Sequence, residues 1–461
     1  MADMTFEITN KNFVEWFCSN GGIISSKITF KDYSFENAGR GIVALEDIES
    51  NEMLFEIPHS IFFSLKTSSL TSQISSKEFN NLYKINQWFP LIICLMYESQ
   101  NKDSLWKPYF DILPTEFNTP MFWNEDELEE LVGTGLIEKI GRDDVENSFN
   151  EYLLSFIQSK SLLFDPNVHN LKLFHQMGSL IMSYAFFDDD EKENDKDDDD
   201  DDDDDDDGDD EGDDEGDERE IETDKEENDI EKMNQIMMIP MADMLNHKTG
   251  FNNARLFREK GLSQMIATKK INKGEQIYNT YGDLCSSDLL RKYGFVDENN
   301  IHDIVEINGQ FVVDNLSVEE TNKKEKVELL LEEDILDDVF ILDTKNNLPP
   351  DLIITVKVMM MNKTQFKILK EMRKFPKPKM IPELRNPLIE LLKKRLSEYE
   401  TSINEDEEIL NKNNISKKLK NAITVRLSEK RILQNVIDFL VSWEPENVID
   451  KKRRNKRIKV E

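Results

Sequence analysis

The N-terminal part of the chain passes from a helical to an extended pattern of apolar positions. Residues 6–20 predict a short helix whose apolar positions are Phe13, Val14, Trp16 and Phe17. The glycine pair at 21–22 ends this helix. Two short strands are then expected at 41–44 and 53–57, and Pro58 ends the second one.

The middle of the chain, residues 80–187, has a mostly helical pattern. Leu91, Ile92, Leu95 and Met96 recur at the spacing of one helix face. Residues 171–187 (LKLFHQMGSLIMSYAFF) predict a buried helix. The longest strongly apolar stretch, 88–97, is about half of the roughly 20 residues that a bilayer-spanning helix needs. We therefore expect no membrane association.

A dense acidic segment, residues 188–231, interrupts this pattern. It contains 32 acidic and four basic residues, so it carries −28 of the net charge of −37. Such a segment repels itself and has nothing to bury, so we expect a disordered insertion. It is either a tolerated loop or an arm that attracts basic proteins, and the plain loop is the simpler interpretation.

Regular patterns resume after the acidic segment. Residues 236–310 alternate short strands with turns at several glycines. The chain is then helical from about 313, with helices indicated by Leu388, Leu391, Leu392 and Tyr399 and by Ile432, Leu433, Val436, Phe439 and Leu440. Residues 451–461 form a tail with seven basic side chains. This tail is typical of a nuclear localisation signal, although a solvated basic terminus has the same composition.

The bulk composition limits the class of protein. A length of 461 residues predicts two or three domains. Cys18, Cys94 and Cys285 lie far apart and form no CxxC pair, so neither a zinc site nor a disulfide framework is expected. The N-terminus has no secretory signal pattern. We expect a soluble, intracellular and mildly acidic protein outside the acidic segment.

Four short clusters could carry chemistry. They are AGRG at 38–41, ADMLNH at 242–247, GEQIYNTYG at 274–282 and YGF at 293–295. Each one alone is more typical of a tight turn than of a site, because glycine beside polar or aromatic residues is common in turns. Their order along the chain is more informative than any one of them.

In that order, together with NEMLFEIP, SLWKPYFDILP, PMFW and MSYAF, the clusters resemble the SET-domain methyltransferases. The resemblance is to the branch of Rubisco large-subunit methyltransferase, and within it to SET domain-containing protein 6 and the fungal ribosomal-lysine methyltransferases. It implies an α+β fold with a knotted, β-rich SET domain over 1–305. A helical insertion would occupy about 60–235, an all-α substrate-binding domain 306–445 and the basic tail 446–461.

The resemblance also implies roles for individual residues. The cofactor would be S-adenosylmethionine, and its contacts would be Ala38, Gly39, Arg40, Tyr184, Asn246, His247 and Tyr293. Tyr281 would be the catalytic tyrosine. Trp88 and Tyr278 would line the channel for the substrate side chain. A phenylalanine often stands at the position of Tyr278 in relatives, and this choice influences how many methyl groups are added.

The implied reaction is attack of a lysine amine on the sulfonium methyl group, without a metal. Free lysine has a pKa near 10.4, so deprotonation at pH 7 costs about 4.6 kcal/mol, which burial in an aromatic channel reduces. The expected partner is a non-histone, ribosomal or histone protein that presents a lysine. A histidine acceptor and a catalytically inactive binding module are the alternatives. We expect a monomer without direct nucleic-acid binding, in the nucleus, with the cytoplasm as a second location.

Overall fold

The computed structural model describes residues 2–36, 38–187, 235–316, 322–412 and 414–445. The chain divides into two compact units. The first contains Met1–Phe117 and Arg142–Gly282, and the second contains Asn118–Gly141 and Asp283–Glu461. The acidic segment and the basic tail lie outside the described residues, so the expectations about them remain predictions.

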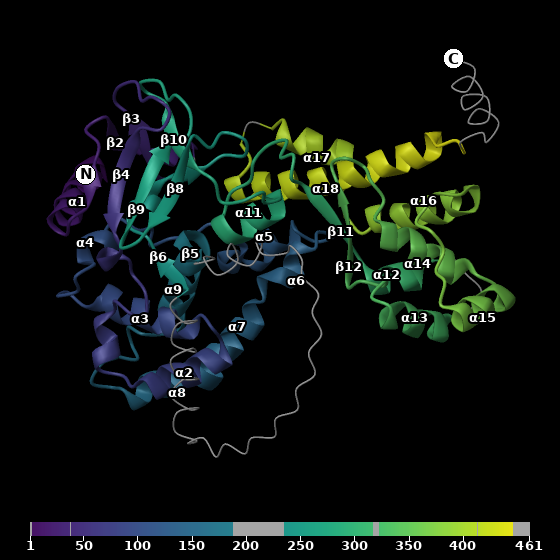
Figure 1. Ribbon diagram of the computed structural model, residues 1–461, viewed down its shortest axis with the longest axis horizontal. Helices are drawn as coiled ribbons and strands as arrows, with labels where there is room; N and C mark the ends of the chain where they lie inside the picture. Colours follow the sequence, from purple (N-terminus) through teal and green to yellow (C-terminus); the bar gives the residue numbers. More distant parts are fainter. Residues whose placement is uncertain (1, 37, 188–234, 317–321, 413, 446–461) are drawn as a thin grey trace, which may run out of the picture. The chain divides into compact units, whose positions relative to one another are not determined.

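Two four-stranded sheets form the β-rich part of the first unit (Figure 1). One has the order β1 (Ile23–Ile24), β4 (Met53–Pro58), β9 (Leu262–Ala267) and β8 (Ala254–Glu259). The other has the order β2 (Ile28–Asp32), β3 (Arg40–Ala44), β10 (Gln276–Asn279) and β7 (Asn246–His247). Both strands predicted near the N-terminus are confirmed, as β3 and β4.

In the second of these sheets, β10 brings the distant chemical clusters together. Gln276 and Ile277 pair antiparallel with β3, whereas Tyr278 and Asn279 pair parallel with β7. The sheet therefore places the AGRG, ADMLNH and GEQIYNTYG clusters next to one another, although more than 200 residues separate the first from the last.

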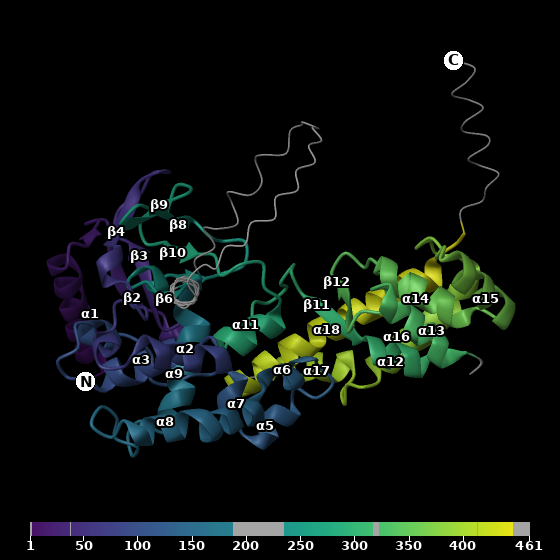
Figure 2. The same cartoon turned by 60° about the horizontal axis from the view of Figure 1, so that its bottom comes forward.

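The N-terminal helix α1 (Ala2–Ser19) begins earlier than predicted and ends where the sequence indicates. Phe13, Trp16 and Phe17 are buried in the core of the first unit. A Cβ atom at Gly22 would lie 2.2 Å from the Phe17 ring, so only glycine fits directly after this helix. In Figure 1 and Figure 2, α1 lies at the outer edge of the strands of this unit.

The insertion within the first unit is largely helical, as predicted. Its α-helices are α2 (Ser76–Ile85), α3 (Phe89–Gln100), α4 (Lys107–Phe110), α7 (Arg142–Ser148), α8 (Leu154–Ser159) and α9 (Leu171–Tyr184). The single helix predicted for 171–187 is wrong in its last three residues. Ala185–Phe187 form β5, which pairs with β6 (Ile236–Met238) from the far side of the acidic segment.

The second unit is mainly helical. Its α-helices are α5 (Glu125–Glu129), α6 (Leu136–Ile140), α11 (Ser286–Tyr293), α12 (Gly309–Asn315), α13 (Lys323–Glu332), α14 (Pro350–Met360), α15 (Lys363–Met372), α16 (Pro382–Leu396), α17 (Ile403–Leu410) and α18 (Lys417–Ser442). Figure 2 shows α12 to α16 gathered beside the long helix α18.

Two features of the second unit differ from the sequence prediction. The strand β12 (Val339–Asp343) lies where we expected helices alone. It pairs antiparallel with β11 (Ile304–Asn308), which lies within the stretch where strands were expected. The second difference is α11, a helix within 236–310, where the prediction of strands and turns alone was wrong. It ends at Gly294, whose φ of +76° is the left-handed conformation of a helix terminus.

Residues 118–141 lie in the expected insertion by sequence but belong to the second unit by packing. Trp123, Leu131 and Leu136 form a small core with three residues from α11 and α18, namely Leu290, Ala422 and Val425. The compact units therefore combine segments that are far apart in the chain, and the domain boundaries at 60, 235 and 305 stay predictions.

Candidate active site

The candidate cofactor loop leads from β2 through a short 3-10 turn, Ser34–Glu36, into β3. The N–H of Ala38 donates to the carbonyl of Tyr33 at 3.1 Å, and the N–H of Tyr33 donates to the carbonyl of Gly39 at 2.6 Å. Gly39 has a φ of +62°, which favours glycine at this position. Ala38 is exposed and Gly39 and Arg40 are half-buried, so the loop backbone is accessible before the strand enters the core.

Gly41, the last residue of the AGRG cluster, faces two side-chain amides. A Cβ atom at this position would lie 2.6 Å from Asn246 Nδ2 and 2.6 Å from Gln276 Nε2. Both amide nitrogens are buried, and neither has a hydrogen-bond partner among the described residues. Because buried donors are normally paired, these two fit a ligand that offers acceptor atoms beside the glycine. The adenine and carboxylate of S-adenosylmethionine carry such atoms.

His247 and Tyr281 form the second part of the site. The N–H of Tyr281 donates to His247 Nδ1 at 3.1 Å, so Nδ1 is the acceptor in this contact. The two rings stack with a centroid separation of 5.2 Å and an interplanar angle of 23°. The hydroxyl of Tyr281 donates to the carbonyl of Leu245 at 3.0 Å. Three contacts therefore hold the predicted catalytic tyrosine against the ADMLNH cluster.

A buried polar group lies beside these residues. Tyr184 ends α9, and its hydroxyl is subject to the charges of Asp243 and Arg40. The hydroxyl of Tyr109 donates to Asp243 Oδ2, while Asp243 Oδ1 has no hydrogen-bond partner among the described residues. Burial raises the pKa of Asp243 well above its ordinary value, and it also raises the pKa of Tyr109 and Tyr184. Burial therefore disfavours the charged form of the Asp243 carboxyl.

Sequence reasoning missed Asp243, Tyr109, Gly41 and Gln276 as site residues. Asp243 and Gly41 were within clusters already singled out, and Gln276 was within the tyrosine cluster. Tyr109 was within SLWKPYFDILP, which carried family resemblance but no assigned role. The available signal was the position of Asp243 in an otherwise apolar stretch, three residues before Asn246. An acid in such a stretch is expected to have a partner, because acids are seldom buried without one.

The remaining predicted residues have different positions. Tyr278 lies opposite Asn246, and its N–H donates to Asn253 Oδ1 at 2.8 Å. Trp88 is half-buried against the core of the first unit at the start of α3. Tyr293 ends α11 in the second unit, where burial raises its pKa to about 12. Their roles in lining the channel or contacting the cofactor stay predictions.

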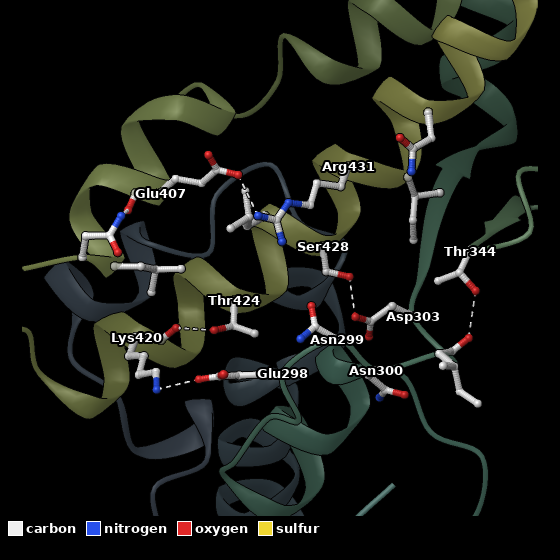
Figure 3. A pocket seen from close by; sticks show the side chains of 16 residues that line it. Glu298, Asn299, Asn300, Asp303, Thr344, Glu407, Lys420, Thr424, Ser428 and Arg431 are labelled. Atoms are coloured by element: carbon white, nitrogen blue, oxygen red, sulfur yellow. Dashed lines mark hydrogen bonds and ion pairs between the residues drawn. The ribbon is translucent and has the colours of Figure 1, made fainter. Parts of the chain in front are cut away.

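A separate open hollow of about 720 Å³ lies within the second unit, between α17, α18 and the loop 298–303 (Figure 3). Its wall is held by Asp303, which accepts hydrogen bonds from the N–H of Ser286 at 2.7 Å and from the hydroxyl of Ser428. Leu427 and Ile432 line it as buried apolar residues. We call this hollow the α17–α18 groove.

The rim of the α17–α18 groove carries two exposed ion pairs. Lys420 lies 2.8 Å from Glu298, and Arg431 lies 2.7 Å from Glu407. Figure 3 shows the two pairs on different walls. Exposed pairs contribute about 0–1 kcal/mol, so these side chains can exchange partners with a ligand at little cost.

Family models match both parts of the chain. The SET domain model matches residues 39–282, and the Rubisco LSMT substrate-binding model matches residues 317–433. The first match includes Gly39–Gly41 of the cofactor loop, the ADMLNH cluster and Tyr281. The second includes α17 and most of the α18 residues that line the groove.

Curated relatives agree with these matches. The N-lysine methyltransferase SETD6 of Mus musculus is 28% identical over 93% of this chain and 89% of its own length. The N-lysine methyltransferase setd6 of Danio rerio is 31% identical over 78% of this chain and 75% of its own length. Ribosomal lysine N-methyltransferase 4 of Saccharomyces cerevisiae is 32% identical over 63% of this chain and 56% of its own length.

A solved structure shares the fold. Rubisco LSMT bound to AdoMet superposes with a TM-score of 0.68, covering 94% of this chain and 91% of that one at 21% identity. The SET domain model spans more than half of the chain. The Danio rerio relative exceeds 30% identity over more than two thirds of it. The chain therefore belongs to the SET-domain family of S-adenosylmethionine-dependent lysine methyltransferases.

Proposed function

We propose that the substrate of this enzyme is a lysine of a non-histone or ribosomal protein, or of a histone. The observation that carries the proposal is the contact of Tyr281 with Leu245 and His247, next to the unpaired amides of Asn246 and Gln276. The names of the curated relatives, which are lysine methyltransferases, support lysine as the acceptor.

The hydrogen bond of Tyr281 defines what its hydroxyl can do. A phenol has one donor, and here that donor is used by the carbonyl of Leu245. The phenol oxygen can also accept a hydrogen bond, and in this role it would orient the amine or the methyl group of the cofactor. Bound S-adenosylmethionine supplies a methyl group on a positive sulfur. Holding the two reactants in line can contribute roughly 7–11 kcal/mol to lowering the barrier in favourable systems.

The acceptor is tested with labelled S-adenosylmethionine. The wild-type enzyme and a Tyr281→Phe variant are incubated with a cell extract, and labelled proteins are identified by mass spectrometry. Bands that depend on Tyr281 and carry methyl-lysine are the expected result. Methyl-histidine at the labelled position would instead support a histidine acceptor. Cofactor binding in calorimetry without any Tyr281-dependent label would support an inactive binding module.

We further propose that the protein substrate docks in the α17–α18 groove. Its side-chain amides, such as Asn299 and Asn435, offer both donors and acceptors, as a polypeptide backbone requires. Three carboxylates and two cations line it, so a segment with charges of both signs fits better than a polyanion. The family model that matches this region is described as substrate-binding.

Docking in the α17–α18 groove predicts different effects on the KM for a protein substrate and on the KM for a short peptide, because a short peptide lacks the segment that would dock. The double variant Lys420→Ala with Arg431→Ala should raise the KM for the intact protein substrate and leave the KM for a short lysine peptide unchanged. Lys393→Ala, which removes a cation from another exposed ion pair on α16, is the matched control. Equal effects of the double variant on the peptide and on the protein would contradict docking in this groove.

We also propose a nuclear location and a monomeric state. Support for the nucleus comes from the seven basic residues in 451–461. A fluorescent fusion should leave the nucleus when residues 451–459 are removed, and sedimentation should give the mass of one chain.

Among the described residues, no helix has the length and apolar character to cross a bilayer.

A further inference from the structure

The guanidinium of Arg40 is held by the N-terminal helix. Its Nε donates to Asn10 Oδ1 at 2.7 Å, and one terminal nitrogen lies 3.3 Å from the hydroxyl oxygen of Thr9. The guanidinium carbon lies 4.8 Å from the centre of the Phe6 ring. The other terminal nitrogen donates to the carbonyl of Ile112. The side chain of a cofactor-loop residue is therefore largely enclosed by protein groups.

The three residues of α1 that hold Arg40 lie on one helix face. Phe6, Thr9 and Asn10 are spaced at i, i+3 and i+4, and the same face continues to the buried Phe13. Asn10 is only 7% exposed. Burial lowers the pKa of Arg40, and the charges of Tyr184 and Asp32 oppose this shift. The side-chain oxygens of Thr9 and Asn10 add hydrogen bonds to the guanidinium.

The same helix also supports the other side of the site. Further along its buried face, the Trp16 ring is stacked on Tyr109 with a centroid separation of 6.4 Å and an angle of 13°. Tyr109 donates to Asp243, which lies in the turn Ala242–Met244. This turn leads directly into Leu245, whose carbonyl accepts the hydroxyl of Tyr281.

We infer that α1 positions the cofactor site, and that Asn10 is the positioning residue through which it holds the loop 38–41. The helix supports both segments that would surround the cofactor. It binds Arg40 of the loop directly, and it packs on Tyr109, which in turn binds Asp243 of the ADMLNH cluster. It precedes residue 39, where the match to the SET domain model begins. The inference does not depend on which protein carries the acceptor lysine.

The test compares three full-length variants by calorimetry with S-adenosylmethionine, by steady-state kinetics and by thermal unfolding. Asn10→Ala should weaken cofactor binding about tenfold, the effect of losing a hydrogen bond to a charged group. Its KM for the cofactor should rise, while kcat at saturating cofactor stays within about twofold of wild type. Asn10→Asp should restore most of the affinity, because a carboxylate also accepts from the guanidinium. Lys11→Ala, on the exposed side of the same helix turn, should change nothing.

Two results would overturn the inference. One is a folded Asn10→Ala variant with wild-type affinity for the cofactor. The other is an Asn10→Asp variant no better than Asn10→Ala. If Asn10→Ala does not fold, Phe6→Leu is measured instead, because it removes the ring over Arg40 and keeps an apolar side chain. Wild-type cofactor affinity in a folded Phe6→Leu protein would then count against positioning by α1.

Discussion

The hydroxyl of Tyr281 donates a hydrogen bond to the main-chain carbonyl of Leu245, at 3.0 Å. This contact joins the GEQIYNTYG cluster to the ADMLNH cluster, which begins more than 30 residues earlier in the chain. It also orients the phenol oxygen, because the neighbouring ring of His247 stacks on Tyr281 and limits its rotation.

Replacing Tyr281 by phenylalanine should therefore abolish most turnover and leave cofactor binding nearly unchanged. The ring can still stack on His247, but the oxygen that orients the amine is gone. Single-turnover methylation and calorimetry with S-adenosylmethionine measure the two effects separately. Tyr152→Phe is the matched control, since it removes an exposed hydroxyl from the helical insertion. Near-normal turnover of Tyr281→Phe would refute the assignment.

Gly41 and Gly39 should differ sharply when each is changed to alanine. In Gly41→Ala the new Cβ would lie 2.6 Å from the amides of Asn246 and Gln276, so the cofactor pocket must distort. In Gly39→Ala nothing lies within 4 Å of the new Cβ, and only the positive φ costs roughly 1–2 kcal/mol. Calorimetry should show cofactor binding lost in the first variant and retained in the second. Similar affinities in both would show that the pocket does not adjoin Gly41.

Glu429 should make stability depend on pH. Burial raises its pKa from 4.5 to about 7, so the folded protein keeps a proton that the unfolded chain releases in this window. The groups that face it are the Tyr399 hydroxyl at 2.5 Å, Arg395 at 3.9 Å and the charges of Glu306 and Asp303. The protonated carboxyl makes its full contribution to the free energy of unfolding below pH 4.5. This contribution is lost as the pH rises through 7.

Glu429→Gln removes this titration. The free energy of unfolding of the variant, relative to wild type, should therefore increase by about 3 kcal/mol between pH 4.5 and pH 8. Urea unfolding at a series of pH values measures the difference. Glu408→Gln, on the exposed side of α17, provides the control for removing one charge. A constant difference between Glu429→Gln and wild type across this range would show that Glu429 does not titrate there.

Two arginines of α18, five residues apart, should contribute very differently to stability. Arg426 donates to the buried carboxylate of Asp406 and to Glu130 in the segment 118–141. Arg426→Leu removes several hydrogen bonds to Asp406, which keeps Lys430 as a cationic partner, and it should cost about 2–3 kcal/mol. Arg431 forms an exposed pair with Glu407, and Arg431→Ala should cost less than about 1 kcal/mol. Equal losses in urea unfolding would contradict this reading of the two pairs.

Local patterns were enough to predict many of the elements. The helix ending at Gly21, the strands β3 and β4 and the helices of the insertion follow from apolar spacing and from glycine and proline, which act within a few residues. The prediction failed at Ala185–Phe187, where the partner strand comes after the acidic segment. It also failed at α11, although Gly294 was a visible helix terminus.

The sequence by itself determined the family, the cofactor and the order of the site residues, because these are carried by short motifs in a constant order. Only the tertiary structure decided that Asn10 holds Arg40, that Tyr109 pairs with Asp243 and that 118–141 packs with α18. These contacts join residues 30 to about 300 positions apart. They depend on how whole helices and strands pack, and no periodicity along the chain encodes them.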